Sequence, residues 1–361
     1  MMAADTLVVQ ALIHPELLYS MGLEQWDLFL RQARRANLLS RFSVQIRDAG
    51  GLERVPAQVR PHLVAECNLA EQQQRVIEWE LVCIRQALAT VDLPLILLKG
   101  AAYVAAGLPP AYGRRFSDVD ILVPGDSLGK AERALYLHGW FAEKQDPYDQ
   151  QYYRRWMHEL PPLRHARRRT VLDVHHTIVP LTMRLNPDPD KLIAGTVAAG
   201  PEGRLRVLAP VDMVLHCAAH LFLDGEFRNA LRDLVDLDLL LQEFRHDPGF
   251  WDELLARAVE MDLAGPMYYA AISLKRYLQA PIPDSVISVL ERNASGRLAR
   301  YLMGKLLDRA VTVHHPGCDD AFSGLARSLL YIRGHYLRMP LYLLLPHLLR
   351  KSLHGQVVTA G

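Results

Sequence analysis

Two aspartates that lie two residues apart are the most specific chemical feature of this sequence. Asp118 and Asp120 belong to the stretch Ser-Asp-Val-Asp-Ile-Leu-Val, which is typical of a strand. Because side chains two apart on a strand share a face, both carboxylates can reach one point in space. A third carboxylate, Asp173, lies on an alternating strand-like segment, residues 170–178. Carboxylate oxygens suit magnesium, so three of them on neighbouring strands predict a two-metal site for phosphoryl or nucleotidyl transfer.

Basic and glycine-containing segments beside these aspartates could hold phosphate. The apolar run at residues 95–98 predicts a strand buried on both faces, and a Lys-Gly-Ala turn then opens a short helix that ends at Gly107. Backbone amides at such a turn bind anions. Two arginines and a serine stand directly before the first aspartate, where a guanidinium can neutralise phosphate charge. The candidate nucleotide-binding residues here are Lys99, Gly100, Ala101, Arg114, Arg115 and Ser117.

The histidines near this chemistry each admit two interpretations. His175 shares the face of Asp173, so it could orient that carboxylate or assist an acceptor hydroxyl, or it could be a hydrogen-bonded structural residue. His216 and His220 are four apart on a predicted helix, which is the spacing of a two-histidine metal face. Since the sequence shows neither a zincin glutamate nor a third ligand, a packed or substrate-lining pair is favoured over zinc.

The elements that must position these residues follow from periodicity and from proline breaks. Apolar residues at helical spacing predict helices over residues 1–90, and strands are expected at 140–144, 159–163 and 170–178. Asp126 is expected to cap a helix over residues 130–137. Beyond Pro180 the chain is expected to be helical to near its end. The prediction is an α+β protein: a small mixed β-sheet core at 91–180, flanked by an N-terminal helical segment at 1–90 and a C-terminal helical domain at 181–361.

Composition narrows the class of protein and its partners. The chain has 361 residues, a formal net charge of +1 and four widely spaced cysteines. This balance gives no global attraction to nucleic acid, and the spacing favours reduced thiols over a disulfide framework. The apolar run Met339–Leu349 is too short to span a bilayer, and no secretory signal is evident, so we expect no transmembrane segment and a cytoplasmic location. The sequence does not indicate an oligomeric state.

The motifs around the aspartates carry a resemblance to a known family. The sequence Leu-Lys-Gly-Ala, followed by Gly-Arg-Arg-Phe-Ser-Asp-Val-Asp-Ile-Leu-Val, resembles the uncharacterised bacterial nucleotidyltransferases of the polymerase-beta superfamily. The strand Leu-Asp-Val-His and the helical Leu-Arg-Asp-Leu-Val-Asp-Leu suit the layout of that family. The same pattern is similar to the toxin-type (AbiEii-like) nucleotidyltransferases of toxin–antitoxin and abortive-infection systems.

The resemblance implies roles for particular residues. Asp118 and Asp120 hold two Mg²⁺ ions, with Mn²⁺ as an alternative, and Asp173 is the third carboxylate. Gly100 marks the phosphate-binding turn. On the C-terminal side, the candidates for facing the cleft are Arg232, Asp233 and Asp236, whose other interpretation is an exposed salt-bridged helix face.

The sequence departs from the family at the turn. Gly-Ala replaces the usual Gly-Ser or Gly-Gly, and the loop to Asp118 is long and contains Pro109 and Pro110. Lys99 and Arg115 are expected to take over the missing serine contact.

The predicted function is Mg-dependent transfer of an NMP from an NTP, with ATP favoured, to an acceptor hydroxyl with release of pyrophosphate. The acceptor could be a protein, a tRNA or a small molecule. One alternative is a metal-dependent glycosyltransferase that uses a nucleotide sugar, although the segment before residue 95 lacks the larger nucleotide-binding sheet expected of it. A second alternative is a non-catalytic binding protein with the same fold.

Overall fold

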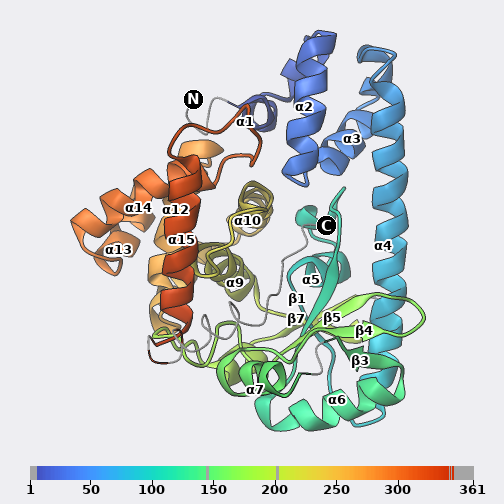
Figure 1. Ribbon diagram of the computed structural model, residues 1–361, viewed down its shortest axis with the longest axis vertical. Coiled ribbons are helices and arrows are strands. Elements are labelled where there is room, and N and C mark those ends of the chain that lie inside the picture. The colour runs from blue at the N-terminus through green and yellow to red at the C-terminus, as the bar shows by residue number, and fades with distance from the viewer. Residues whose placement is uncertain (1–5, 144–145, 201–202, 341, 343, 345–361) are drawn as a thin grey trace.

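A mixed seven-stranded sheet lies between helical segments (Figure 1). The computed structural model describes residues 6–143, 146–200, 203–340, 342 and 344. The strand order across the sheet is β3-β4-β5-β2-β1-β7-β6. The strands are β1 (Ile96–Leu98), β2 (Asp118–Leu122), β3 (Trp140–Ala142), β4 (Leu163–His165), β5 (Val171–His175), β6 (Val197–Ala199) and β7 (Leu205–Val207). The predicted α+β class with flanking helical segments is confirmed.

The N-terminal helices pack on two different parts of the chain. Trp26, Phe29 and Phe42 stack edge to face, with ring centroids 5.3 and 5.0 Å apart, in a core that also takes in Leu231 and Val235. The long α4 runs along the side of the sheet (Figure 1) and buries its apolar stripe there. These elements are α1 (Leu7–Ile13), η2 (Pro15–Tyr19), α2 (Leu23–Arg35), α3 (Leu39–Asp48), η3 (Gly51–Arg54) and α4 (Arg60–Ala89). The predicted helical character of this segment is confirmed.

The register of the central strands decides which polar residues meet. Strand β2 pairs antiparallel with β1, which sets Leu98 opposite Asp120. It pairs in parallel with β5 on its other side, which sets Asp173 opposite Asp120. Since Lys99 follows β1 directly and opens α5 (Lys99–Ala105), one cation and two carboxylates come from three adjacent elements.

Three predictions about secondary structure are wrong. Residues 181–361 are not helical throughout, because they contain β6 and β7, and β7 pairs in parallel with β1. Strands of three residues show too little alternation to be read from sequence. The strand expected at 159–163 is β4, Leu163–His165, and Glu159 only forms an isolated bridge to His175.

The third correction concerns the helix after β2. Asp126 lies in η5 (Gly125–Ser127) and accepts a hydrogen bond from Ser127 Oγ at 3.0 Å, rather than capping α6 (Leu128–Leu137). The 3-10 helix η5 directly precedes α6, so Asp126 lies inside η5 and not at the residue before α6.

The C-terminal part of the described chain adds eight further helices. They are α8 (Pro189–Ala194), α9 (Pro210–Leu223), α10 (Ala230–Phe244), α11 (Phe250–Glu260), α12 (Ala264–Tyr277), α13 (Asp284–Arg292), α14 (Arg297–Ala310) and α15 (Ser323–Arg338). Of these, α9 and α10 face the start of β2. In the described part of the chain, no helix has the length and apolar character needed to cross a membrane. Most of the run Met339–Leu349 lies outside the described residues. The four cysteines are free thiols, as expected. The division into three domains stays a prediction.

Candidate active site

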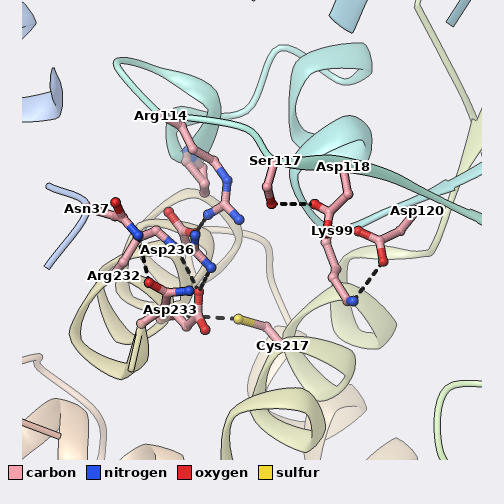
Figure 2. A network of polar contacts seen from close by, with 12 residues as sticks. Asn37, Lys99, Arg114, Ser117, Asp118, Asp120, Cys217, Arg232, Asp233 and Asp236 are labelled. Carbon is pink, nitrogen blue, oxygen red and sulfur yellow. Dashed lines mark hydrogen bonds and ion pairs between the residues drawn. The ribbon is translucent and has the colours of Figure 1, made fainter. Parts of the chain in front are cut away.

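Asp118 and Asp120 line one cavity of about 340 Å³ between β2, α5 and the α9–α10 connection. The polar residues around it come from far apart in the chain and face one another (Figure 2). Ser117 Oγ donates to Asp118 at 2.9 Å. Burial and the neighbouring charge of Asp120 raise the pKa of Asp118. The pocket therefore disfavours the ionised form of Asp118.

Asp120 is the most strongly paired of the carboxylates. Its Oδ1 accepts a hydrogen bond from Lys99 Nζ at 2.7 Å and lies 2.9 Å from His175 Nε2. Burial alone would raise the pKa of Asp120, but Lys99 and His175 outweigh it and hold that pKa well below its ordinary value. Burial likewise opposes the charge of Lys99, yet Asp120 raises the pKa of that ammonium. At neutral pH the two residues form a partly buried ion pair.

Asp173 differs from Asp120 because the charges nearest to it are mainly negative. Burial and the charges of Asp120, Glu159 and Asp118 raise its pKa to about 8. Its Oδ1 is buried and has no hydrogen-bond partner among the described residues. An orphaned buried oxygen beside three other carboxylates is the electrostatic environment that a bound divalent cation relieves.

A group that sequence reasoning missed adjoins this cluster. His158, Glu159 and His175 each offer a ligand atom, and these atoms lie within 4.8 Å of one another. Glu159 Oε2 is 3.5 Å from His175 Nε2. Burial and the neighbouring His175 lower the pKa of His158 well below its ordinary value, so its ring is neutral and able to ligate. The isolated bridge between Glu159 and His175, which no sequence pattern reveals, brings the two residues together.

Gly100 stands where a side chain has little room. A Cβ at this position would lie 3.0 Å from the Phe116 ring and 3.1 Å from Arg114 Nε. The neighbouring Lys99 has a left-handed backbone, φ 46°, which a non-glycine residue adopts only under strain. Ala101 is buried in the hydrophobic core. The turn therefore brings the start of α5 close to the loop before β2.

Arg114 and Asp236 belong to a buried ion network that fixes this loop. Arg114 and Arg41 both form ion pairs with Asp236, and the second pair measures 3.0 Å. Arg41 Nη2 also donates to the carbonyl oxygen of Pro110 at 2.7 Å. Burial and the charge of Arg232 lower the pKa of both arginines to about 10. The network joins α3, the loop before β2 and α10 through groups that are almost fully buried.

Helices α9 and α10 form the opposite wall of the cavity. His220 lines it, and burial and the charge of Lys99 lower the pKa of His220 to about 3. His216 is buried one turn earlier. Arg232 Nη2 donates to Asp233 Oδ1 at 2.6 Å, and both residues line the cavity. The pair at 216 and 220 is thus packed and, at His220, cavity-lining, and neither residue belongs to the His158, Glu159 and His175 group.

The structure brings most of the predicted site residues to one cavity and sets four of them apart. Ala101 and Asp236 are buried behind the cavity wall, and Asp173 and His175 lie on the adjacent strand. In the N-terminal helices sequence reasoning missed Arg41, whose charge within an apolar helical pattern was the available signal. The predicted residues that line the cavity are Lys99, Gly100, Arg114, Arg115, Ser117, Asp118, Asp120, Arg232 and Asp233.

Comparison with known proteins bears on this arrangement. Residues 23–279 match a family described as uncharacterised nucleotidyltransferases. The chain belongs to this family. Membership covers α2 to the end of α12 and therefore includes every residue of the cavity and of the network behind it. None of the curated proteins matches the chain. Family membership supports an enzyme of the nucleotidyltransferase class. The similarity to toxin-type members stays a prediction.

Proposed function

We propose that this protein is a Mg-dependent nucleotidyltransferase that moves an NMP from an NTP, with ATP favoured, to an acceptor hydroxyl and releases pyrophosphate. The observation that carries the proposal is the register of β2 and β5. It sets Asp173 directly opposite Asp120, while Asp118 lines the same cavity as Gly100. Family membership supplies the reaction class.

The residues present fit a pair of divalent ions. Asp118, Asp120 and Asp173 would hold them, since Asp173 has an orphaned buried oxygen and a raised pKa that added positive charge would correct. Bound ions would supply charge stabilisation for the attacking and leaving oxygens of an in-line displacement. The adjoining His158, Glu159 and His175 group keeps Mn²⁺ as an alternative, because imidazole suits transition metals better than Mg²⁺.

The chain's own residues bind and orient the nucleotide. Lys99 and Arg115 provide positive charge at the cavity, and backbone amides at the Gly100 turn, which also lines it, can bind a phosphate. Asp120 holds Lys99 in place through its ion pair. The buried network of Arg41, Arg114 and Asp236 keeps the loop before β2 in position, so Asp236 acts as a positioning residue.

The test is transfer of label from α-labelled NTPs in a cell lysate. The wild type is expected to label protein, RNA or a small molecule, and Asp120→Asn to lose labelling while it keeps its fold. Asp126→Asn is the matched control, since that carboxylate is exposed and bonds only its neighbour Ser127 in the described structure. Full labelling by Asp120→Asn would show that the carboxylates have another role.

Two other functions make different predictions in a thermal-shift panel. Stabilisation by an NTP with Mg²⁺ supports nucleotidyl transfer, and stabilisation by a nucleotide sugar with Mg²⁺ supports a glycosyltransferase. A chain that responds to neither is a non-catalytic binding protein. The carboxylate cluster favours the first outcome, because a protein without turnover gains nothing from an unpaired Asp173.

A further inference from the structure

A second cavity of about 350 Å³ adjoins the first, and five arginines line it. No carboxylate is found among its lining residues in the described part of the chain. We propose that this arginine pocket, formed by Arg34, Arg35, Arg115, Arg228 and Arg232, binds a phosphate group carried by the acceptor. The inference rests on the proposed function and names the chemical class of the molecule that receives the nucleotide.

The positive charge of the pocket is only partly neutralised. Arg232 pairs with Asp233 at 2.6 Å, whereas Arg34 and Arg115 share one carboxylate, Glu66, at 3.7 and 4.0 Å. Within the described residues, Arg35 and Arg228 form no ion pair. Guanidinium groups gathered without counter-charges attract an anion, and phosphate accepts their paired N–H donors well.

Hydrogen bonds hold the walls of the pocket together in advance. Asn37 Nδ2 donates to Asn229 Oδ1 at 2.7 Å, which joins the end of α2 to the start of α10. Gln73 of α4 accepts from the backbone N–H of Phe116 at 3.0 Å, which joins α4 to the loop before β2. Preorganisation of this kind lowers the entropic cost of binding. Compensation of the α2 dipole accounts for Arg34 and Arg35 but not for the other three arginines, which lie on other segments.

The position of the pocket indicates the acceptor rather than the NTP. Arg115, Ser117, Arg228 and Arg232 line both cavities, so one wall is common to the two. Ser117 also donates to Asp118 at 2.9 Å. A molecule anchored in the arginine pocket therefore reaches the carboxylates past Ser117. Lys99 and Gly100, which are proposed to hold the triphosphate, line only the first cavity.

The experiment measures binding of two phosphate compounds and of the NTP separately, by calorimetry on the full chain. The probes are glucose 6-phosphate and a 5′-phosphorylated tetraribonucleotide, without metal, and a non-hydrolysable ATP analogue with Mg²⁺. The variant is Arg34→Gln/Arg35→Gln, since both side chains are exposed and line only the arginine pocket. It is expected to bind at least one phosphate probe about tenfold or more weakly and with a flatter salt dependence, while the affinity for the analogue stays within about twofold.

Arg31→Gln is the matched control, because Arg31 lies one turn before Arg35 on α2 and pairs with Asp27 outside the pocket. It should leave all three affinities unchanged. Which probe binds distinguishes a sugar phosphate from a terminal nucleotide. The proposal is overturned if the wild type binds neither probe, if the double variant binds both as well as the wild type, or if it loses the ATP analogue equally. A wild type that binds a probe but not the analogue would contradict the proposed function alone.

Discussion

Lys99 Nζ lies 2.7 Å from Asp120 Oδ1, so the ammonium contacts the same carboxylate that is proposed to hold a metal ion. The lysine and a divalent ion therefore compete for one oxygen. Lys99→Met is expected to increase the stabilisation by Mg²⁺, because the carboxylates then lack their internal cation. The same change is expected to raise the KM for the NTP about tenfold or more, because a phosphate contact is lost. Thermal shifts with and without Mg²⁺, and initial rates, measure the two effects. A smaller Mg²⁺ shift in Lys99→Met would contradict the competition.

Asp173→Asn should stabilise the metal-free protein while it abolishes NMP transfer. The folded pKa of about 8 lies above the ordinary 3.8, so the folded state holds the proton between these values and loses stability as pH rises through this window. The amide removes that loss, which amounts to about 5 kcal/mol at pH 8 at ~1.4 kcal/mol per unit of pKa difference. Urea unfolding in a chelator at pH 8 and at pH 4.5 measures the effect, and an equal gain at both values would exclude a charge origin.

Gly100→Ala should lower kcat/KM about tenfold. The new methyl group meets the Phe116 ring at 3.0 Å and Arg114 Nε at 3.1 Å, so these two side chains of the loop before β2 must shift by a few tenths of an ångström. Gly129→Ala on α6 provides the control, because a Cβ at this position meets no described atom within 4 Å. This change is expected to raise the free energy of unfolding by about 0.5–1 kcal/mol. Equal activity of both variants would remove Gly100 from the site.

Asp236→Asn should cost about 3–5 kcal/mol of unfolding free energy, because it leaves two buried guanidinium groups without a counter-charge. The exposed pair Arg31 and Asp27 is the comparison, and Asp27→Asn should cost less than about 1 kcal/mol. Denaturant unfolding gives both values. If Asp236 touched the nucleotide instead of positioning the loop, Mg-NTP would stabilise the wild type far more than the variant.

His220 should contribute to loss of stability in acid. Its folded pKa of about 3 lies below the ordinary 6.5, so the unfolded chain takes up a proton first, and stability that is complete above pH 6.5 is lost as pH falls toward 3. His220→Gln is expected to reduce the loss between pH 7.5 and pH 5 by about 2 kcal/mol. The exposed His62→Gln is the control and should follow the wild type.

The residue types of the site were predicted more completely from the sequence than their arrangement in space. The spacing of Asp118 and Asp120, the Lys-Gly turn and the alternation around Asp173 are local patterns, and each lies on the element expected for it. Strand β7 was not predicted because its three residues are too few to show a periodicity. Its place beside β1 also depends on a crossover connection that no local sequence pattern encodes. The part of Glu159 in the site was not predicted, because a single isolated bridge to His175 brings it there.

In the N-terminal helices, the secondary structure could be predicted but a long-range ion pair could not. Their apolar periodicity predicted helices correctly, yet it could not indicate that Arg41 reaches across to Asp236, because such a pair depends on how distant segments pack. The same holds for the arginine pocket, whose members lie on segments far apart in the chain, from Arg34 to Arg232.

The sheet register and the Asp236 network also constrain how the protein is made. On the ribosome, β1 and β2 emerge well before β7 and α10, so β1 first has an open edge and Arg41 has no buried carboxylate to meet. Open strand edges on a nascent chain invite incorrect pairing. The site can therefore reach its final form only after residue 236 has left the exit tunnel, and any chain terminated before that point is inactive from synthesis onward.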